Sequence, residues 1–145
     1  MIIEYLYPAY DFIKKTQREL KAVKGLTNEE SGGIVLYEQS WYGLITLRRF
    51  VEIPNVKGIY YSSDKTDFYM PEGLQYRKEI EAGLKCGYQI GDWHTHFGNT
   101  TPSSIDDDTM MNKAKINRKA MMIIISEDHS KLFIYKKDRI KTQIL

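Results

Sequence analysis

The fold of this chain depends most on one stretch, GDWHTH at residues 91–96, followed after a short loop by Ser103 and Asp106. The stretch contains His94 and His96, two of the three histidines of the chain. An apolar run leads into them, which predicts a strand, and residues two apart on a strand project from the same face. A serine followed three residues later by an aspartate is typical of the capping box that opens a helix. Both imidazoles and a carboxylate of the first helical turn can therefore meet at one cation.

Two neutral histidines and one carboxylate make three protein ligands, which leave tetrahedral zinc an open position for water. A catalytic zinc site has this arrangement, whereas a structural site is closed by a fourth protein ligand. A His-x-His pair is also common by chance, and acidic residues near a helix N-terminus stabilise the helix without any metal. The neighbouring residues therefore have to decide between a metal site and an ordinary junction of strand and helix.

The arrangement resembles the metal motif His-x-His-x(7)-Ser-x-x-Asp of the JAMM (MPN-plus, or Jab) metalloprotease family, and the preceding GDW is similar to its prokaryotic Jab branch. The matching residues are His94, His96, Ser103 and Asp106. Six residues separate the second histidine from Ser103, where the family has seven, so a strict count selects Ser104 and Asp107. Prokaryotic members of the family commonly place a proline before the serine and a β-branched residue before the aspartate, as Pro102 and Ile105 do here, so the resemblance favours Ser103 and Asp106. A loop shorter by one residue costs little free energy.

The family also has an upstream glutamate in a Glu-x-x-Gly pattern before an apolar strand. Glu30, in the stretch ESGGIVL at residues 30–36, matches this pattern about sixty residues ahead of the histidines. Taken alone, Glu30 would be an ordinary loop carboxylate beside Glu29. The resemblance implies one zinc ion per chain held by His94, His96 and Asp106, with Glu30 as general base and Ser103 as a donor to the oxyanion.

Hydrophobic periodicity predicts the order of the secondary-structure elements. We expect a strand within residues 1–7, a helix from Pro8 to about Gly25, strands at 32–38 and 42–53, a short strand at 68–70, a helix beginning at Pro71, the histidine strand, a helix from Ser103, and strands at 120–126, 131–135 and 140–145. This order agrees with the fold that the resemblance implies. That fold is α/β, with one domain over residues 1–145 and a mixed, largely antiparallel sheet flanked by about three helices, in the JAMM/MPN, cytidine-deaminase-like architecture.

Three details of this expectation concern burial. The helix after Pro71 should direct Tyr76, Ile80, Gly83 and Leu84 into the core. Cys86, near the end of that helix, is expected to be a small buried or half-buried residue. The almost continuously apolar run at 120–126 is expected to form an interior strand.

Composition indicates a globular domain, with 42% hydrophobic and 28% charged residues. The net charge is +2, and the basic residues are scattered along the sequence among acids, so nucleic acid is not an implied partner. The single cysteine excludes an intrachain disulfide, which fits a reducing cytoplasm. No signal peptide is recognisable, and the longest apolar run is too short to cross a bilayer, so we expect a cytoplasmic protein without a membrane partner.

The resemblance implies hydrolysis of a peptide or isopeptide bond after the C-terminal tail of a ubiquitin-like protein. The implied partners are that protein or its conjugates, together with ubiquitin-activating-like and ubiquitin-conjugating-like proteins of the same operon, including antiphage operons. One alternative is a peptidase that matures a sulfur-carrier protein, and another is a non-catalytic MPN-type scaffold. A cupin-like metal enzyme would need a further ligand, and only His129, in a predicted turn, remains. Tyr60 and Tyr61 either clamp a substrate tail or pack over a sheet edge.

Overall fold

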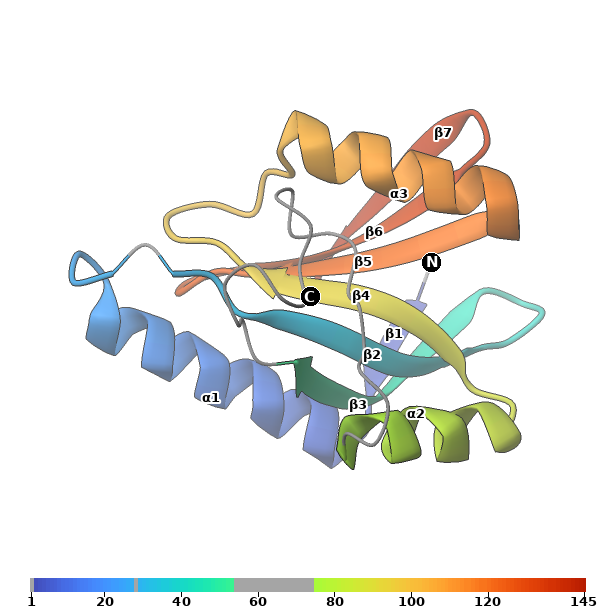
Figure 1. The fold of residues 1–145 in the computed structure, drawn as a ribbon, viewed down its shortest axis with the longest axis horizontal. Coiled ribbons are helices and arrows are strands. Elements are labelled where there is room, and N and C mark those ends of the chain that lie inside the picture. The colour runs from blue at the N-terminus through green and yellow to red at the C-terminus, as the bar shows by residue number, and fades with distance from the viewer. Residues whose placement is uncertain (1, 28, 54–74) are drawn as a thin grey trace.

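The computed structural model in Figure 1 describes residues 2–27, 29–53 and 75–145. Within these residues, seven strands form one sheet, which is accompanied by three helices. The elements are β1 (Ile2–Tyr5), α1 (Tyr7–Val23), β2 (Gly32–Gln39), β3 (Leu44–Ile53), α2 (Gln75–Lys85), β4 (Gln89–Thr95), α3 (Ser104–Asn117), β5 (Lys119–Ile125), β6 (Ser130–Lys136) and β7 (Arg139–Ile144). The predicted strand at 68–70, the predicted helix start at Pro71, and Tyr60 and Tyr61 lie outside the described residues.

The strands lie in the order β1-β3-β2-β4-β5-β6-β7. The pairs β1–β3 and β4–β5 are parallel, and the other neighbouring pairs are antiparallel. The predicted mixed, largely antiparallel sheet with three helices is thus confirmed for the described part of the chain. The apolar strand β5 lies between β4 and β6, as its composition predicted. A parallel pair needs a crossover connection, and α3 provides it between β4 and β5.

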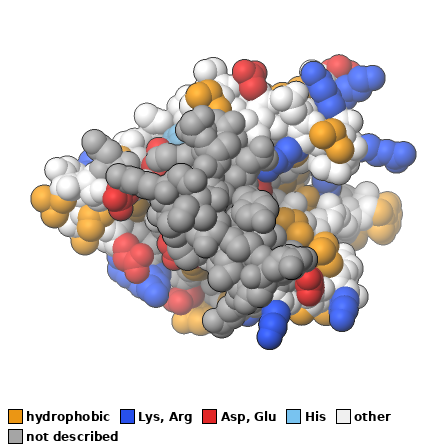
Figure 2. Space-filling model, viewed as in Figure 1, with side chains coloured by type: hydrophobic (Ala, Val, Ile, Leu, Met, Phe, Trp, Pro, Cys, Tyr) orange, Lys and Arg blue, Asp and Glu red, His pale blue; other side chains and the backbone are white. Residues whose placement is uncertain are grey.

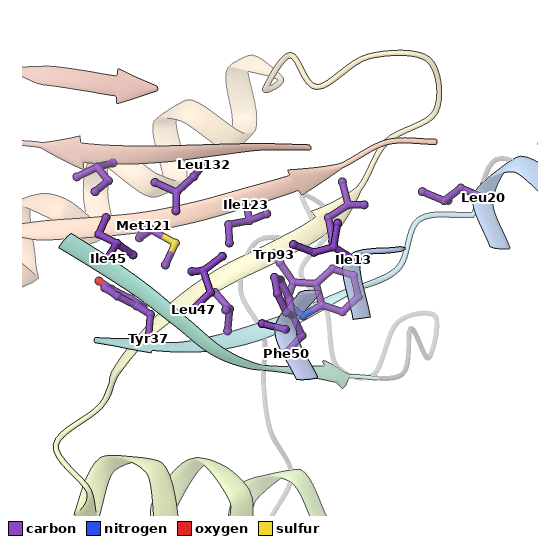
Figure 3. Close-up of a cluster of buried hydrophobic side chains, with 14 residues drawn as sticks. Ile13, Leu20, Tyr37, Ile45, Leu47, Phe50, Trp93, Met121, Ile123 and Leu132 are labelled. Carbon is purple, nitrogen blue, oxygen red and sulfur yellow. The ribbon is translucent and has the colours of Figure 1, made fainter. Parts of the chain in front are cut away.

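One face of the sheet packs against α1 (Figure 1). Figure 3 shows this core, in which Ile13 lies beside Phe50 and Trp93. Phe12 stacks on the ring of Phe50 at a centroid distance of 5.0 Å and meets the ring of Trp93 edge-on at 5.0 Å. Burying a large apolar side chain stabilises the fold by about 1.5–3 kcal/mol relative to exposing it. The aromatic cluster therefore fixes α1 against the middle of the sheet.

The opposite face of β5 and β6 packs against α3 (Figure 1). Met110 and Ala114 of α3 are buried against Met122 and Ile124 of β5. Because side chains alternate along a strand, β4 directs Trp93 into the core beneath α1 and directs His94 toward the side of α3. This alternation brings the histidine strand and the start of α3 to the same site.

Of the core residues predicted for α2, the side chains of Tyr76 and Ile80 lie outside the described part of the structure, and the predictions for the others are partly correct. Gly83 is buried, and a Cβ added there would lie 2.9 Å from a terminal methyl of Leu36. Leu84 is 52% exposed, so its expected core position was wrong, and Cys86 is exposed, so the expected burial or half-burial of Cys86 was wrong too. Leu84 follows Gly83 by one residue and so points about 100° around the helix from the contact, and Cys86 comes after the last helical turn.

Among the described residues, no helix is both long and apolar enough to cross a membrane.

Candidate metal centre

His94 and His96 lie at the carboxyl end of β4. His94 is in the strand and opposes Gly32 of β2, while His96 follows the last strand residue and donates its backbone N–H to the carbonyl of Ile125 at 3.0 Å. The two Nε2 atoms are 3.0 Å apart, and the side chains are only 12% and 15% exposed. Two mostly buried rings therefore direct their Nε2 atoms at one point.

Asp106 reaches the histidines from the first turn of α3. Ser103 is the N-cap, and its hydroxyl accepts a hydrogen bond from the backbone N–H of Asp106 at 3.0 Å. In return, the Oδ2 atom of Asp106 accepts from the backbone N–H of Ser103 at 2.9 Å, which completes the predicted capping box. The same Oδ2 lies 3.3 Å from Nε2 of His94 and 3.7 Å from Nε2 of His96. The helix cap therefore positions the carboxylate for the site.

The ionisation of these residues suits metal binding. Burial lowers the pKa of His96, and the neighbouring His94 lowers it further, which favours the neutral imidazole. Burial by itself would raise the pKa of Asp106, but hydrogen bonds and charge from His94, with hydrogen bonds from Ser103, outweigh it and lower that pKa to about 2. Metals bind neutral imidazole and ionised carboxylate, so His96 and Asp106 have the required form at neutral pH.

Glu30 lies beside this group, just ahead of β2. Its Oε1 atom is 3.9 Å from Nε2 of His96, and its side chain is 32% exposed. The next residue, Ser31, is fixed to the histidine strand, because its backbone N–H donates to the hydroxyl of Thr95 and its carbonyl accepts from the backbone N–H of Thr95, both at 2.9 Å. The glutamate thus approaches the histidines from a segment that is hydrogen-bonded to their own strand.

A glycine allows β2 to lie close to its neighbours. A Cβ at Gly33 would lie 2.0 Å from the carbonyl oxygen of Val51 and 3.0 Å from Nε1 of Trp93. That indole nitrogen donates to the same carbonyl at 3.1 Å, beneath the glycine. The Glu-x-x-Gly pattern therefore places its glycine where no side chain fits.

The structure separates the two possible registers of the motif. Among the described residues, the group able to hold a metal consists of His94, His96 and Asp106, whose ligand atoms all lie within 4.8 Å of one another. Asp107 instead accepts a hydrogen bond from the hydroxyl of Tyr135 at 2.7 Å. His129 is exposed in the turn between β5 and β6 and is not part of the group.

Two supporting contacts were not evident from the sequence. The backbone of Thr101 hydrogen-bonds to the ring of His96, which can fix the orientation of that ring. Glu127, only 3% exposed, accepts from the backbone N–H of Gly98 with both oxygens, at 3.1 and 2.9 Å, and pairs with Nζ of Lys24 at 2.5 Å. It ties the loop between the histidines and Asp106 to the end of α1. Glu127 follows the apolar run of β5, but no local pattern indicates its distant partners.

Comparison with known proteins gives little beyond this geometry. No model of a known protein family matches the chain, and no curated protein matches it. Among solved structures, the chain resembles the N-terminal domain of STIL from Trichoplax adhaerens, with a TM-score of 0.44 and 9% sequence identity. The similarity covers 91% of this chain and 40% of that one, so the chain spans less than half the length of the matched structure. A likeness of this size carries no argument about function.

Proposed function

We propose that the chain is a zinc-dependent peptidase or isopeptidase of the JAMM (MPN-plus) type, with the corresponding JAMM/MPN architecture. The observation that carries the proposal is the meeting of two imidazole nitrogens and one carboxylate oxygen, with a second carboxylate, Glu30, 3.9 Å from Nε2 of His96. A structural ion pair would need one histidine and one acid. Three ligand atoms and an adjacent base are the components of metal-assisted hydrolysis.

The spacing of the ligand atoms fits zinc. Tetrahedral zinc with bonds of about 2.0–2.2 Å holds its ligand atoms roughly 3.3–3.6 Å apart. The three separations between Nε2 of His94, Nε2 of His96 and Oδ2 of Asp106 are 3.0, 3.3 and 3.7 Å. Two imidazoles and one carboxylate are also a ligand set that zinc accepts, with a fourth position left open. These separations lie within about 0.3 Å of the tetrahedral range, so the residues present suit the ion.

The proposed chemistry assigns each residue one task. Zinc held by His94, His96 and Asp106 would supply Lewis acidity, which polarises a carbonyl and lowers the pKa of water to ~7. Glu30 takes the proton of the attacking water and later gives it to the leaving amine, as a general base that becomes a general acid. The hydroxyl of Ser103 already accepts from the N–H of Asp106, so its own hydrogen is free to point at the developing oxyanion.

The substrate class follows from the family resemblance, not from the geometry. It is the C-terminal tail of a ubiquitin-like protein, joined to a lysine or followed by further residues. Maturation of a sulfur carrier would use the same zinc chemistry, so the two substrates differ only in the protein that carries the tail. The exposed fraction of Glu30, 32%, is consistent with a base that an extended chain can reach.

The first test is the zinc content of the wild type, Asp106→Ala and Asp107→Ala, prepared identically and measured by elemental analysis. We expect about one zinc per chain in the wild type and in Asp107→Ala, and strong loss in Asp106→Ala, because only Asp106 faces the histidines. Circular dichroism would establish that both variants fold. A folded wild type that takes up no added zinc would refute the proposal, and loss of zinc only with Asp107→Ala would refute the register.

The second test concerns Glu30. Glu30→Gln should retain zinc, because Glu30 is not among the ligands, but should cleave a C-terminally extended ubiquitin-like protein about 10²–10⁴-fold more slowly. Glu29→Gln, which changes the exposed neighbouring acid, is the matched control and should keep its activity. An active Glu30→Gln enzyme would show that another group acts as the base.

A further inference from the structure

A second charged cluster lies at the end of β2 away from the metal centre, and it is basic. In the sheet register, Lys119 of β5 opposes Lys136 of β6, and Lys136 opposes Arg139 of β7. Directly opposed residues project from the same face, so three cations form one row across three strands. Lys141, two residues after Arg139, adds a fourth on that face. We call these four residues the basic cluster.

The charge of the basic cluster is not neutralised within the described part of the chain, where none of its members forms an ion pair. Glu38, at the same end of β2, is paired with Arg48 at 2.7 Å. Like charges directly opposed across a strand pair destabilise it. Burial lowers the pKa of Lys119, and the charge of Lys136 lowers it further. A bound anion would relieve this repulsion.

Exposed aromatic side chains stand next to the basic cluster, on the hairpin between β2 and β3. Trp41 is 95% exposed and Tyr42 is 64% exposed, and their rings meet edge to face at 5.4 Å. A hollow of about 350 Å³ lies between this hairpin and β6–β7, lined by Gln39, Ser40, Trp41, Tyr42, Gly43, Ile134, Lys136 and Lys141. At the right-hand end of Figure 2, Lys and Arg side chains project near hydrophobic ones, and Figure 1 places this hairpin, the turn between β6 and β7 and the end of α3 at that end.

We infer that this hollow binds an acidic segment of a partner protein, with carboxylates against the basic cluster and an apolar side chain against Trp41 and Tyr42. Charge complementarity favours an anion, because the hollow has lysines and no acid in its lining. Exposed tryptophan and tyrosine are typical of the centres of protein interfaces. Single-stranded nucleic acid is less suited, because rings inclined at 89° do not present parallel faces to successive bases.

The test is fluorescence anisotropy with a labelled glutamate-rich peptide that contains interspersed leucines, titrated with the full chain at low salt. Lys136→Gln/Lys141→Gln should weaken binding about tenfold, because both lysines line the hollow. Lys85→Gln/Lys115→Gln removes two exposed lysines elsewhere and is the matched control, with less than about a twofold effect. Trp41→Ala should weaken binding to the leucine-containing peptide more than to polyglutamate.

Two further probes decide the class of partner. If oligo-dT or phosphatidylserine vesicles bind more tightly than the peptide, and through the same lysines, the acidic-protein inference is overturned in favour of that polyanion. Equal binding of the peptide by both double variants would overturn the site itself. The measurements are repeated with metal removed by a chelator, where affinity should be unchanged, so the outcome does not depend on the proposed zinc chemistry.

Discussion

Glu127→Gln should lower the stability of the fold in a way that depends on pH. The carboxylate is 3% exposed and receives hydrogen bonds from Gly98 and an ion pair from Lys24. Hydrogen bonds to a charged group contribute about 1.5–3 kcal/mol each, and glutamine keeps an acceptor for Gly98 but loses the charge that pairs with Lys24. We therefore expect Glu127→Gln to lower the free energy of unfolding by about 1.5–3 kcal/mol at pH 7. Such a loss is a large part of the total free energy of unfolding of a small domain.

The sign of the pH dependence follows from the pKa of Glu127. The hydrogen bond from Lys24, and then that from Gly98, lower this pKa from 4.5 to about 2. A carboxyl group with a lowered pKa in the folded state contributes stability above its unfolded pKa, and the contribution is lost as pH falls from about 4.5 toward 2. Glutamine does not titrate. The difference in unfolding free energy between wild type and variant should therefore narrow as pH falls below about 4.5.

The assay is urea unfolding of the metal-free protein, followed by tryptophan fluorescence. Trp93 is 1% exposed and reports loss of the core, whereas Trp41 is already 95% exposed in the folded chain. The free energy of unfolding of a small domain falls by about 1–3 kcal/mol for each molar increase in urea. The urea concentration at the midpoint of unfolding should therefore be lower in Glu127→Gln by roughly 1 M at pH 7. Asp128→Asn is the matched control, because this neighbouring acid is 62% exposed and lies 3.7 Å from Lys21. Asp128→Asn should lower the free energy of unfolding by less than about 1 kcal/mol. Equal effects of the two substitutions, or a difference that does not change with pH, would refute the reasoning.

Three other predictions concern the site and its support. Gly33→Ala should destabilise the fold by more than about 3 kcal/mol, because its Cβ would lie 2.0 Å from a backbone oxygen, whereas Gly83→Ala meets only the flexible end of Leu36 and should change thermal stability little. Ser103→Ala removes the N-cap of α3, so it should lower the free energy of unfolding by about 1 kcal/mol, as measured with urea, and weaken zinc binding in a competition with a chelator. Ser104→Ala, in the next position, should change neither quantity. Zinc at 100 times its Kd should stabilise the wild type by about 2.7 kcal/mol and Asp106→Ala by almost nothing, as measured by scanning calorimetry.

Local patterns explain what the sequence could predict. The strand was predicted to hold both histidines; β4 ends at Thr95, but the chain stays extended enough to bring His94 and His96 to one point. The reciprocal cap between Ser103 and Asp106 needs only three residues of spacing. The order of the elements followed from hydrophobic periodicity for the same reason. The resemblance to a metal motif added Glu30, whose approach to His96 crosses more than sixty residues of sequence.

Contacts between distant segments explain what the sequence could not predict. Asp107 is turned away from the histidines by its hydrogen bond to Tyr135, a residue of β6. The lysines and arginine of the basic cluster are scattered along the sequence, and only the register of β5, β6 and β7 sets them in a row. The pairing of Glu127 with Lys24 joins residues about one hundred positions apart. Such contacts depend on how elements pack, which a single sequence does not state.

The cap of α3 has a consequence for how the proposed site would take up its metal. One carboxylate oxygen, Oδ2 of Asp106, is already held by the N–H of Ser103 and points at His94 before any ion arrives. The conformational entropy of this side chain is therefore lost during folding, so metal binding does not have to order it. Loss of the ion would leave the first turn of the helix in place. We therefore expect that the proposed site can lose and regain a metal ion without refolding of the chain.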